Sequence, residues 1–158
     1  MSDGIRYGVI DPAEAAGLTG IEMLQAMIAG DLPAPPIAER LGFRLTEVAD
    51  GTAVFVGEAG PHLLNPLGSV HGGWALTLID SAGGCAVHTT LPAGVGYTTV
   101  ETKANFTRAI RADGGLYRCE GRVLSAGRQI ATADVRLFAP DGNLAAHGTS
   151  TLMILRRR

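Results

Sequence analysis

The stretch that decides the fold reads NPLGSVHGGWALTLIDSAGGCAV and covers residues 65–87. From Trp74 to Val87 it has the length of a helix, and only Thr77, Asp80 and Ser81 are polar. A helix that is apolar on nearly all sides is a buried helix. The remaining sequence must therefore supply the layer that surrounds it.

Four runs rich in β-branched and aromatic residues follow this helix and are typical of strands. They cover Thr98 to Phe106, Leu116 to Leu124, Gln129 to Phe138, and Leu144 to Leu155. Short turns that contain glycine separate them, which predicts that successive strands are antiparallel neighbours. In the second run apolar and charged residues alternate, as in a sheet with one face in water.

Two more strands are predicted ahead of the helix, at residues 43–48 and 52–56, on either side of the hairpin turn Asp50-Gly51. Residues 60–69 are rich in proline and glycine, which predicts an ordered loop without regular structure.

The N-terminal part carries a separate signal. Thr19 and Glu22 fit a capping box for a short amphipathic helix that ends at Gly30, and the prolines at 33, 35 and 36 form a stiff connector. We expect an N-terminal extension with this helix, residues 1–36, followed by one domain, residues 37–158.

Composition excludes several classes of protein. The chain has 158 residues and a net charge of −2, so it lacks the broad cationic surface that nucleic acid requires. No apolar run reaches membrane-spanning length, and two cysteines are too few for a disulfide scaffold or a closed metal site. The first residues do not resemble a secretory signal, so we expect a cytoplasmic protein that binds no metal, nucleic acid or membrane.

Asp80 is the first candidate for chemistry, because no cation stands at helical neighbour spacing from it. Burying an unpaired carboxylate costs several kcal/mol, so such a group finds donors elsewhere, becomes protonated, or is kept for function. A structural role, with hydrogen bonds from a nearby loop or strand, and a catalytic role are both open from the residues alone.

The residues at the start of the helix favour a catalytic role. Gly72 and Gly73 could offer free backbone N–H groups as an oxyanion hole, or could form a plain tight turn. His71 could orient a substrate carbonyl or cap the helix. Asn65 could hold a carbonyl or a water molecule, or shape the turn before Pro66.

Gly72 and Asp80 are too far apart to act on one carbonyl within one chain, because eight residues span about 12 Å of helix. Two chains with their central helices side by side and antiparallel would bring Gly72 of one to Asp80 of the other. We therefore expect a homodimer with two equivalent sites at its interface.

The pattern Asn-Pro-x-Gly-x-x-His-Gly-Gly, followed by Asp80, resembles the hotdog-fold acyl-CoA thioesterases of the phenylacetic-acid-degradation type, over roughly Pro33 to Leu155. The resemblance implies an α+β hotdog fold, in which an antiparallel sheet wraps around a long central apolar helix. It also implies hydrolysis of the thioester of an aryl- or medium-chain acyl-CoA, with no cofactor beyond the coenzyme A of the substrate.

Residue by residue, the resemblance makes Asp80 the nucleophile or general base and the Gly72 N–H the oxyanion donor, with Asn65 and His71 completing the catalytic site. It places the Thr99 hydroxyl near the carboxylate. The hydroxyl that some relatives carry one helical turn after the acid is absent, since that position is Gly84.

Further substrate contacts are expected from Gly73 and Trp74, and from three arginines that could meet the phosphates of coenzyme A or remain solvated: Arg108, Arg111 and Arg128. The lining of the acyl pocket is open among Trp74, Leu78, Phe106 and the loop 61–64. The dimers are expected to pair into a dimer of dimers.

Two alternatives are kept. One is a non-catalytic hotdog protein that binds acyl-CoA, and the other is an acyl-CoA hydratase or dehydratase of the same fold. The spacing from His-Gly-Gly to Asp80 favours hydrolysis over hydration.

Overall fold

The computed structural model describes residues 4–113 and 115–156. Its elements in chain order are α1 (Gly20–Ala29), α2 (Pro36–Leu41), β1 (Phe43–Ala49), β2 (Thr52–Glu58), the 3-10 helix η1 (Pro61–Leu63), α3 (Gly72–His88), β3 (Val95–Phe106), β4 (Leu116–Ala126), β5 (Ile130–Phe138) and β6 (Leu144–Arg156). The long apolar helix and all six strands that the sequence predicts are present.

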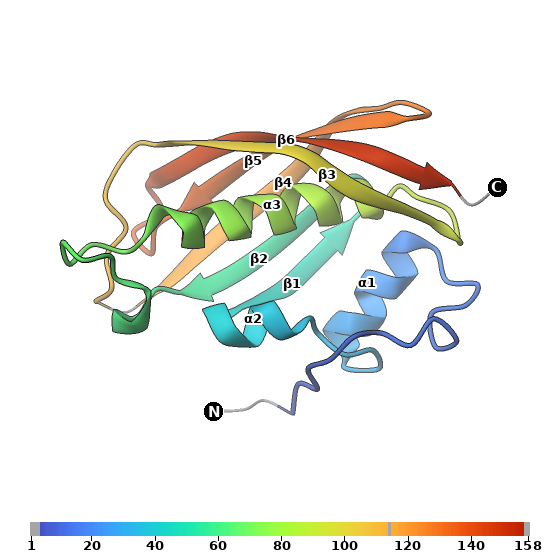
Figure 1. The fold of residues 1–158 in the computed structure, drawn as a ribbon, viewed down its shortest axis with the longest axis horizontal. Helices are drawn as coiled ribbons and strands as arrows, with labels where there is room; N and C mark the ends of the chain where they lie inside the picture. Colours follow the sequence, from blue (N-terminus) through green and yellow to red (C-terminus); the bar gives the residue numbers. More distant parts are fainter. Residues whose placement is uncertain (1–3, 114, 157–158) are drawn as a thin grey trace.

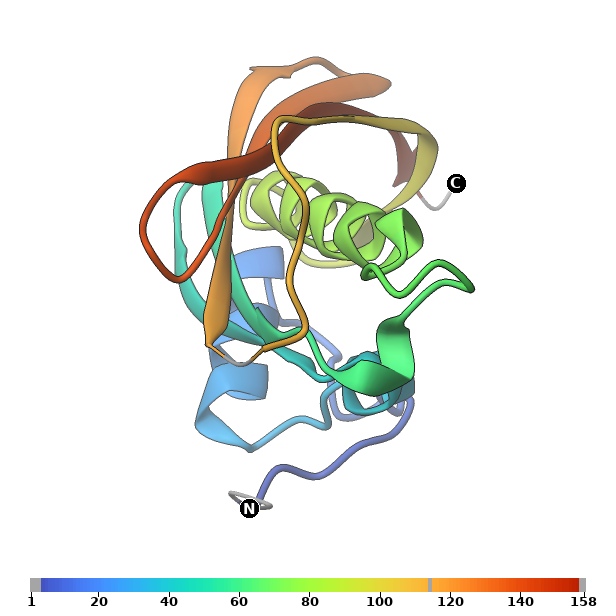
Figure 2. The ribbon, with the colours of Figure 1, turned by 90° about the vertical axis from the view of Figure 1, so that its left-hand side faces the viewer.

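A single antiparallel sheet wraps around α3. The strand order is β1-β2-β4-β5-β6-β3, and α3 lies against the concave face (Figure 1). Figure 2 looks along the helix and shows the sheet curving around it. The predicted α+β class, a sheet around a central apolar helix, is confirmed.

The buried side of α3 packs against the inner face of the sheet and forms part of the core. Leu78 and Ile79 are wholly buried, as are Val135 and Leu137 on the facing β5. The helix approaches β4 so closely at Gly121 that a side chain there would overlap the carbonyl oxygen of Ala82. Glycine at this position therefore lets helix and sheet pack directly.

One predicted strand pairing is wrong. The turn residues 113–115 suggested that β3 and β4 are neighbours, but β3 pairs with β6, and β4 pairs with β2 on its other side. Residues 107–113 belong to a connection that passes over the end of α3 instead of forming a tight hairpin (Figure 2). A loop of this length does not require its flanking strands to pair.

The sequence analysis did not predict two short helices, α2 and η1. The predicted stiff connector ends where α2 begins, because Pro36 occupies the first turn, where a missing N–H removes no helical hydrogen bond. The loop at 60–69 was expected to lack regular structure, but residues 61–63 form the 3-10 helix. The capping box of Thr19 and Glu22 and the end of α1 at Gly30 are confirmed.

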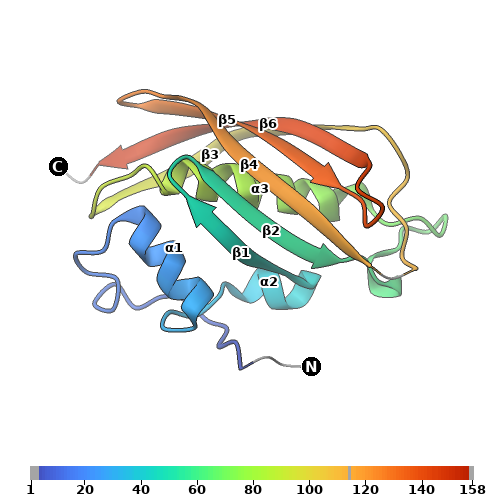
Figure 3. The same cartoon turned by 180° about the vertical axis from the view of Figure 1, so that it is seen from behind.

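The N-terminal residues pack onto the domain. α1 lies against β1, as seen from behind in Figure 3, and Tyr7 makes a bridge to Ala34. The predicted boundary between residues 36 and 37 falls at the start of α2, and it stays a prediction.

One stripe of α3 is left uncovered. Leu76 is exposed, and Thr77, Asp80 and Ser81 are half-buried. β3 beside it is an edge strand, and no other strand of the described residues pairs with its free edge. None of the helices in residues 4–113 and 115–156 combines the length and hydropathy needed to cross a bilayer.

Candidate active site

Asp80 sits in the middle of α3, half-buried, with its side chain directed at β3. Its Oδ1 accepts hydrogen bonds from the hydroxyl groups of Thr99 and Thr102, each at 2.9 Å. Within the described residues it forms no ion pair, and its Oδ2 accepts no hydrogen bond. One carboxylate oxygen is therefore held by the protein and the other is free to act on a ligand.

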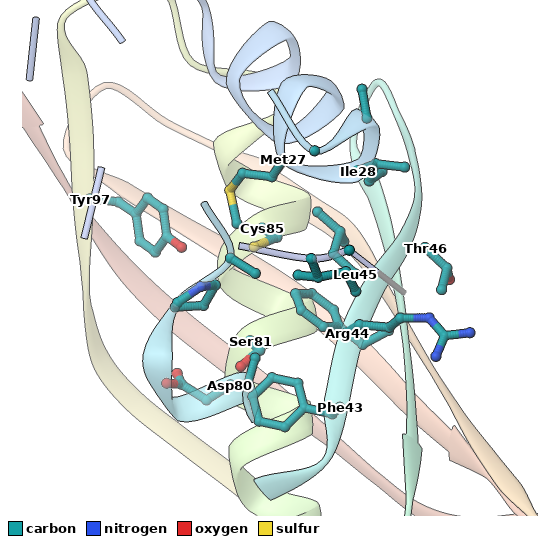
Figure 4. A pocket seen from close by; sticks show the side chains of 18 of the residues that line it. Met27, Ile28, Phe43, Arg44, Leu45, Thr46, Asp80, Ser81, Cys85 and Tyr97 are labelled. Atoms are coloured by element: carbon teal, nitrogen blue, oxygen red, sulfur yellow. The ribbon is translucent and has the colours of Figure 1, made fainter. Parts of the chain in front are cut away.

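A cavity of about 570 Å³ opens beside this carboxylate. Asp80 and Thr99 lie in its wall, and the rest is mainly apolar, including Met27 on α1 and Phe43 on β1. Figure 4 shows Met27, Phe43 and Asp80 around the space, with the charged end of Arg44 pointing away from it. A cavity with apolar walls and a few convergent polar groups is typical of a small-molecule site.

Besides Asp80 and Thr99, α3 and β3 contribute three more polar side chains to the lining of this cavity: Ser81, Cys85 and Tyr97. Desolvation raises the pKa of the Cys85 thiol to about 12, although its contact with the Tyr97 hydroxyl opposes this, and the nearby Asp80 charge adds to it. Desolvation likewise raises the pKa of Tyr97 well above its ordinary value. Both groups are therefore neutral near pH 7, and Cys85 is not an activated nucleophile.

At the start of α3, a hydrogen bond joins the backbone of Gly73 to the side chain of His71. The Gly73 N–H donates to Nδ1 of His71 at 2.9 Å, so His71 caps the helix. The Gly72 N–H makes no hydrogen bond within the part of the chain that the structure describes. Of the two predicted oxyanion donors, only Gly72 remains available, and the ring of Phe106 lies against it.

Asn65 shapes the loop that leads to this helix. Its Oδ1 accepts from the N–H groups of Leu67 and Ser69, at 2.9 and 3.2 Å, and its Nδ2 donates to the Ser69 hydroxyl. These contacts are those of an Asx turn, one of the two roles that the sequence left open.

The predicted substrate contacts are spread over the molecule. Trp74 lies in the core, where its indole N–H donates to the Leu41 carbonyl, so it does not line the cavity. Arg108 and Arg111 make exposed ion pairs with Asp141 and Asp113. Arg128 is in the turn that follows β4, whereas Arg108 and Arg111 precede this strand. The length of β4 therefore separates Arg128 from the other two arginines by roughly 35 Å.

The acyl-pocket residues considered from the sequence are not those that line the cavity. Its apolar wall comes largely from α1, β1 and the segment between them, and neither Leu78 nor Phe106 borders it. Apolar side chains on α1 gave no sign of which element they face, because that depends on how α1 docks onto the sheet.

Two hydroxyl residues near Asp80 were missed, Thr102 on β3 and Ser150 on β6. A usable signal existed for Ser150, since it is the one polar residue in the inward series at 148, 150, 152 and 154. Among the described residues, no group of three or more His, Cys, Asp or Glu side chains is arranged to hold a metal ion.

Comparison with known proteins places this chain in a family. Residues 67–146 match the model of the thioesterase superfamily, so the chain belongs to that superfamily. This confirms the resemblance to the hotdog-fold thioesterases that the motif indicated.

Individual relatives agree with this placement. The solved structure of a conserved protein from Pseudomonas aeruginosa is 32% identical, with a TM-score of 0.70, over 76% of this chain and 94% of that chain. A hypothetical thioesterase from Streptococcus pneumoniae, solved with coenzyme A, is 23% identical with a TM-score of 0.66, over 74% of this chain and 88% of that one, a likeness of fold alone.

Among curated proteins, one from Saccharolobus solfataricus that is named as a proposed esterase is 32% identical over 89 residues, 56% of this chain and 57% of that protein. The chain thus spans about half the length of the curated relatives it matches.

Proposed function

We propose that the protein is an acyl-CoA thioesterase, with Asp80 as its essential carboxylate. The observation that carries this proposal is a carboxylate with one oxygen held by Thr99 and Thr102 and the other unbound, in the wall of an apolar cavity. The curated relatives named as proposed esterases support hydrolysis as the reaction class.

The reaction breaks the carbon–sulfur bond of the thioester. Asp80 either takes a proton from water, which attacks the carbonyl carbon, or attacks that carbon directly to form an anhydride that water then hydrolyses. The carbonyl oxygen gains negative charge and is stabilised by the Gly72 N–H at the helix start. Coenzyme A leaves as the thiolate and takes up the proton, and the free acid is the second product.

This chemistry needs two chains. Gly72 and Asp80 are eight residues apart on α3, about 12 Å along the axis, so one chain cannot place both at one carbonyl. The uncovered stripe of α3 and the free edge of β3 support a second copy docked there, as do the exposed Val100 and Phe106 on β3. A homodimer, and its pairing into a dimer of dimers, are part of this proposal.

The acyl group is proposed to enter the cavity beside Asp80. The volume, about 570 Å³, is within the range of ligand pockets, about 300–1,000 Å³, and suits an aryl or medium-chain acyl group. The coenzyme A moiety would lie outside, near Arg108 and Arg111, whose pairs with acidic residues are exposed and open to exchange with phosphates. The coenzyme A bound to the Streptococcus pneumoniae protein supports this ligand class.

No metal or cofactor enters the proposed reaction. The cytoplasmic location expected from the sequence also stays a prediction.

The experiment is a thiol-release assay over aromatic, short-chain and long-chain acyl-CoA esters, run with the natural protein and with Asp80→Asn. We expect turnover on one of these classes and a loss of roughly a hundredfold or more in Asp80→Asn. Asp134→Asn, a matched change on the outer face of the sheet, should keep full activity. Wild-type turnover by a folded Asp80→Asn protein would exclude Asp80 from the chemistry.

The same assay separates the alternatives when acyl-CoA binding and the consumption of an added enoyl-CoA are measured beside it. Binding of acyl-CoA without thiol release over the whole panel would favour a non-catalytic binder. Consumption of an enoyl-CoA without thiol release would favour a hydratase.

A further inference from the structure

A buried hydroxyl group behind the proposed active site has no part in the reaction described above. Ser150 on β6 is completely buried, and its neighbours in the core include Val135. Its side-chain oxygen lies 2.9 Å from the hydroxyl oxygen of Thr102, its one side-chain partner among the described residues. Alanine would fill almost the same space without a polar atom, so the contact with Thr102 accounts for the serine.

The proton positions along this contact follow from the carboxylate. An ionised carboxylate only accepts hydrogen bonds, so Thr102 donates its proton to Oδ1 of Asp80. The Thr102 oxygen is then left to accept, and Ser150 donates to it. The three side chains form one directed chain from the core to Asp80, in which each bond polarises the next.

A β-bulge makes this chain possible. Side chains at 99 and 102 are an odd number of residues apart and would face opposite sides of a regular strand. The pairing of β3 with β6 shifts register between Thr99 and Glu101, so that Thr99 lies opposite Leu152 and Thr102 lies opposite Ser150. Both threonines then direct their hydroxyl groups to Asp80; bulges often redirect side chains next to active sites in this way.

The two threonines reach Asp80 from different sides. Thr99 borders the cavity, whereas Thr102 does not and approaches from the interior, where Ser150 supports it. Packing also holds Ser150 in place, because it touches α3 at Gly83, where an added Cβ would lie 2.9 Å from the serine oxygen. The carboxylate is thus fixed from behind by groups that a substrate cannot displace.

We propose that Thr102 and Ser150 are positioning residues that hold Oδ1 of Asp80 and so direct Oδ2 toward the cavity. This inference rests on the proposed thioesterase function. Ser150 acts only through Thr102, and neither residue contacts the substrate. Losing the hydroxyl of Thr102 therefore lowers kcat and leaves KM nearly unchanged.

The test compares Thr102→Val, which keeps the shape without the hydroxyl, with Thr102→Ser, which keeps the hydroxyl. We expect kcat to fall about tenfold in Thr102→Val, and to stay near the natural value in Thr102→Ser. Thr102→Ala is a second hydroxyl-free variant should valine hinder folding. Thr151→Val, on the opposite face of β6, is the matched control and should change neither constant.

The role of Ser150 is tested by a double-mutant cycle. Ser150→Ala should lower kcat less than Thr102→Val, and adding it to Thr102→Val should lower kcat no further. The thermal midpoint should behave differently from kcat. Thr102→Val leaves the buried Ser150 hydroxyl without a partner, which lowers the midpoint, and adding Ser150→Ala removes this hydroxyl and should raise the midpoint part of the way back. Additive losses of kcat would contradict a role through Thr102.

The outcomes separate this inference from the proposed function. An unchanged kcat in Thr102→Val, beside an inactive Asp80→Asn, would overturn the positioning role and leave the thioesterase proposal standing. Equal losses in Thr102→Val and Thr102→Ser would also overturn it, since the hydroxyl would not be the cause. Full activity in Asp80→Asn would overturn the function itself.

Discussion

The N–H of Gly73 is bound to Nδ1 of His71 at 2.9 Å, which leaves the N–H of Gly72 as the open donor at the start of α3. One histidine therefore decides which of two adjacent glycines can receive an oxyanion. It also holds the first turn of the helix in place before a substrate arrives, which is the condition for electrostatic stabilisation without reorganisation.

Gly72→Pro removes this donor and little else. Proline is favoured at the first helical position, and His71 before it already has φ −63° and ψ 130°, which proline allows. We expect kcat to fall by about a hundredfold or more. Gly72→Ala is the control, because it keeps the N–H and adds a similar contact with Phe106. Equal kcat in the two variants would exclude the Gly72 N–H as the oxyanion donor.

Much of the fold could be predicted because the deciding signals are local. The capping box of Thr19, the turn at Asp50-Gly51 and the apolar run of α3 each depend on residues close in sequence. The place of β3 was missed because strand order depends on contacts between distant residues, and its partner β6 comes last in the chain.

The candidate site likewise has residues that the sequence could indicate and residues that only the fold brings together. Asp80 and Gly72 are conspicuous in sequence, one as a carboxylate in an apolar helix and the other as a glycine at its start. Thr102 and Ser150 are 48 residues apart and meet only through the pairing of β3 with β6. In a regular strand, alternate side chains face the same side of the sheet. The bulge at Val100 interrupts this alternation, so the sequence pattern of β3 could not show that Thr102 faces Asp80.

The first helix should set the length of the acyl group. Met27 lies in the cavity wall, so Met27→Ala enlarges the space and should shift the preferred acyl-CoA toward longer chains, seen in kcat/KM across a chain-length series. Met23→Ala is the matched control on the same helix, since Met23 borders a different hollow near His88. A length profile that is unchanged in Met27→Ala would place the acyl group elsewhere.

His88 should make the protein sensitive to acid. Burial lowers the pKa of His88 below its ordinary value of 6.5, so the unfolded chain binds the proton more readily than the folded one. Its contribution to stability is complete above pH 6.5 and is lost as the pH falls through the lowered pKa, by at most about 1.4 kcal/mol per pH unit.

This prediction is checked by urea unfolding at pH 7.5 and 5.5. The free energy of unfolding should fall less in His88→Gln than in the natural protein over this interval. His62→Gln, which changes an exposed histidine, should keep the natural loss. An equal loss in all three proteins would exclude His88 as a source of the acid sensitivity.

A crossed pair of heterodimers tests whether each site is shared between chains. One heterodimer combines an Asp80→Asn chain with a Gly72→Pro chain, and the other combines a natural chain with one that carries both changes. In a shared site the first heterodimer has one intact Gly72–Asp80 pair and the second has none, so the first should show about half the natural turnover and the second almost none. Sites contained within single chains would reverse this order, because only the natural chain of the second heterodimer would then be intact.

The comparison needs two affinity tags, to purify each heterodimer, and the thiol-release assay. Because both heterodimers carry the same two substitutions, a general loss of stability affects them alike.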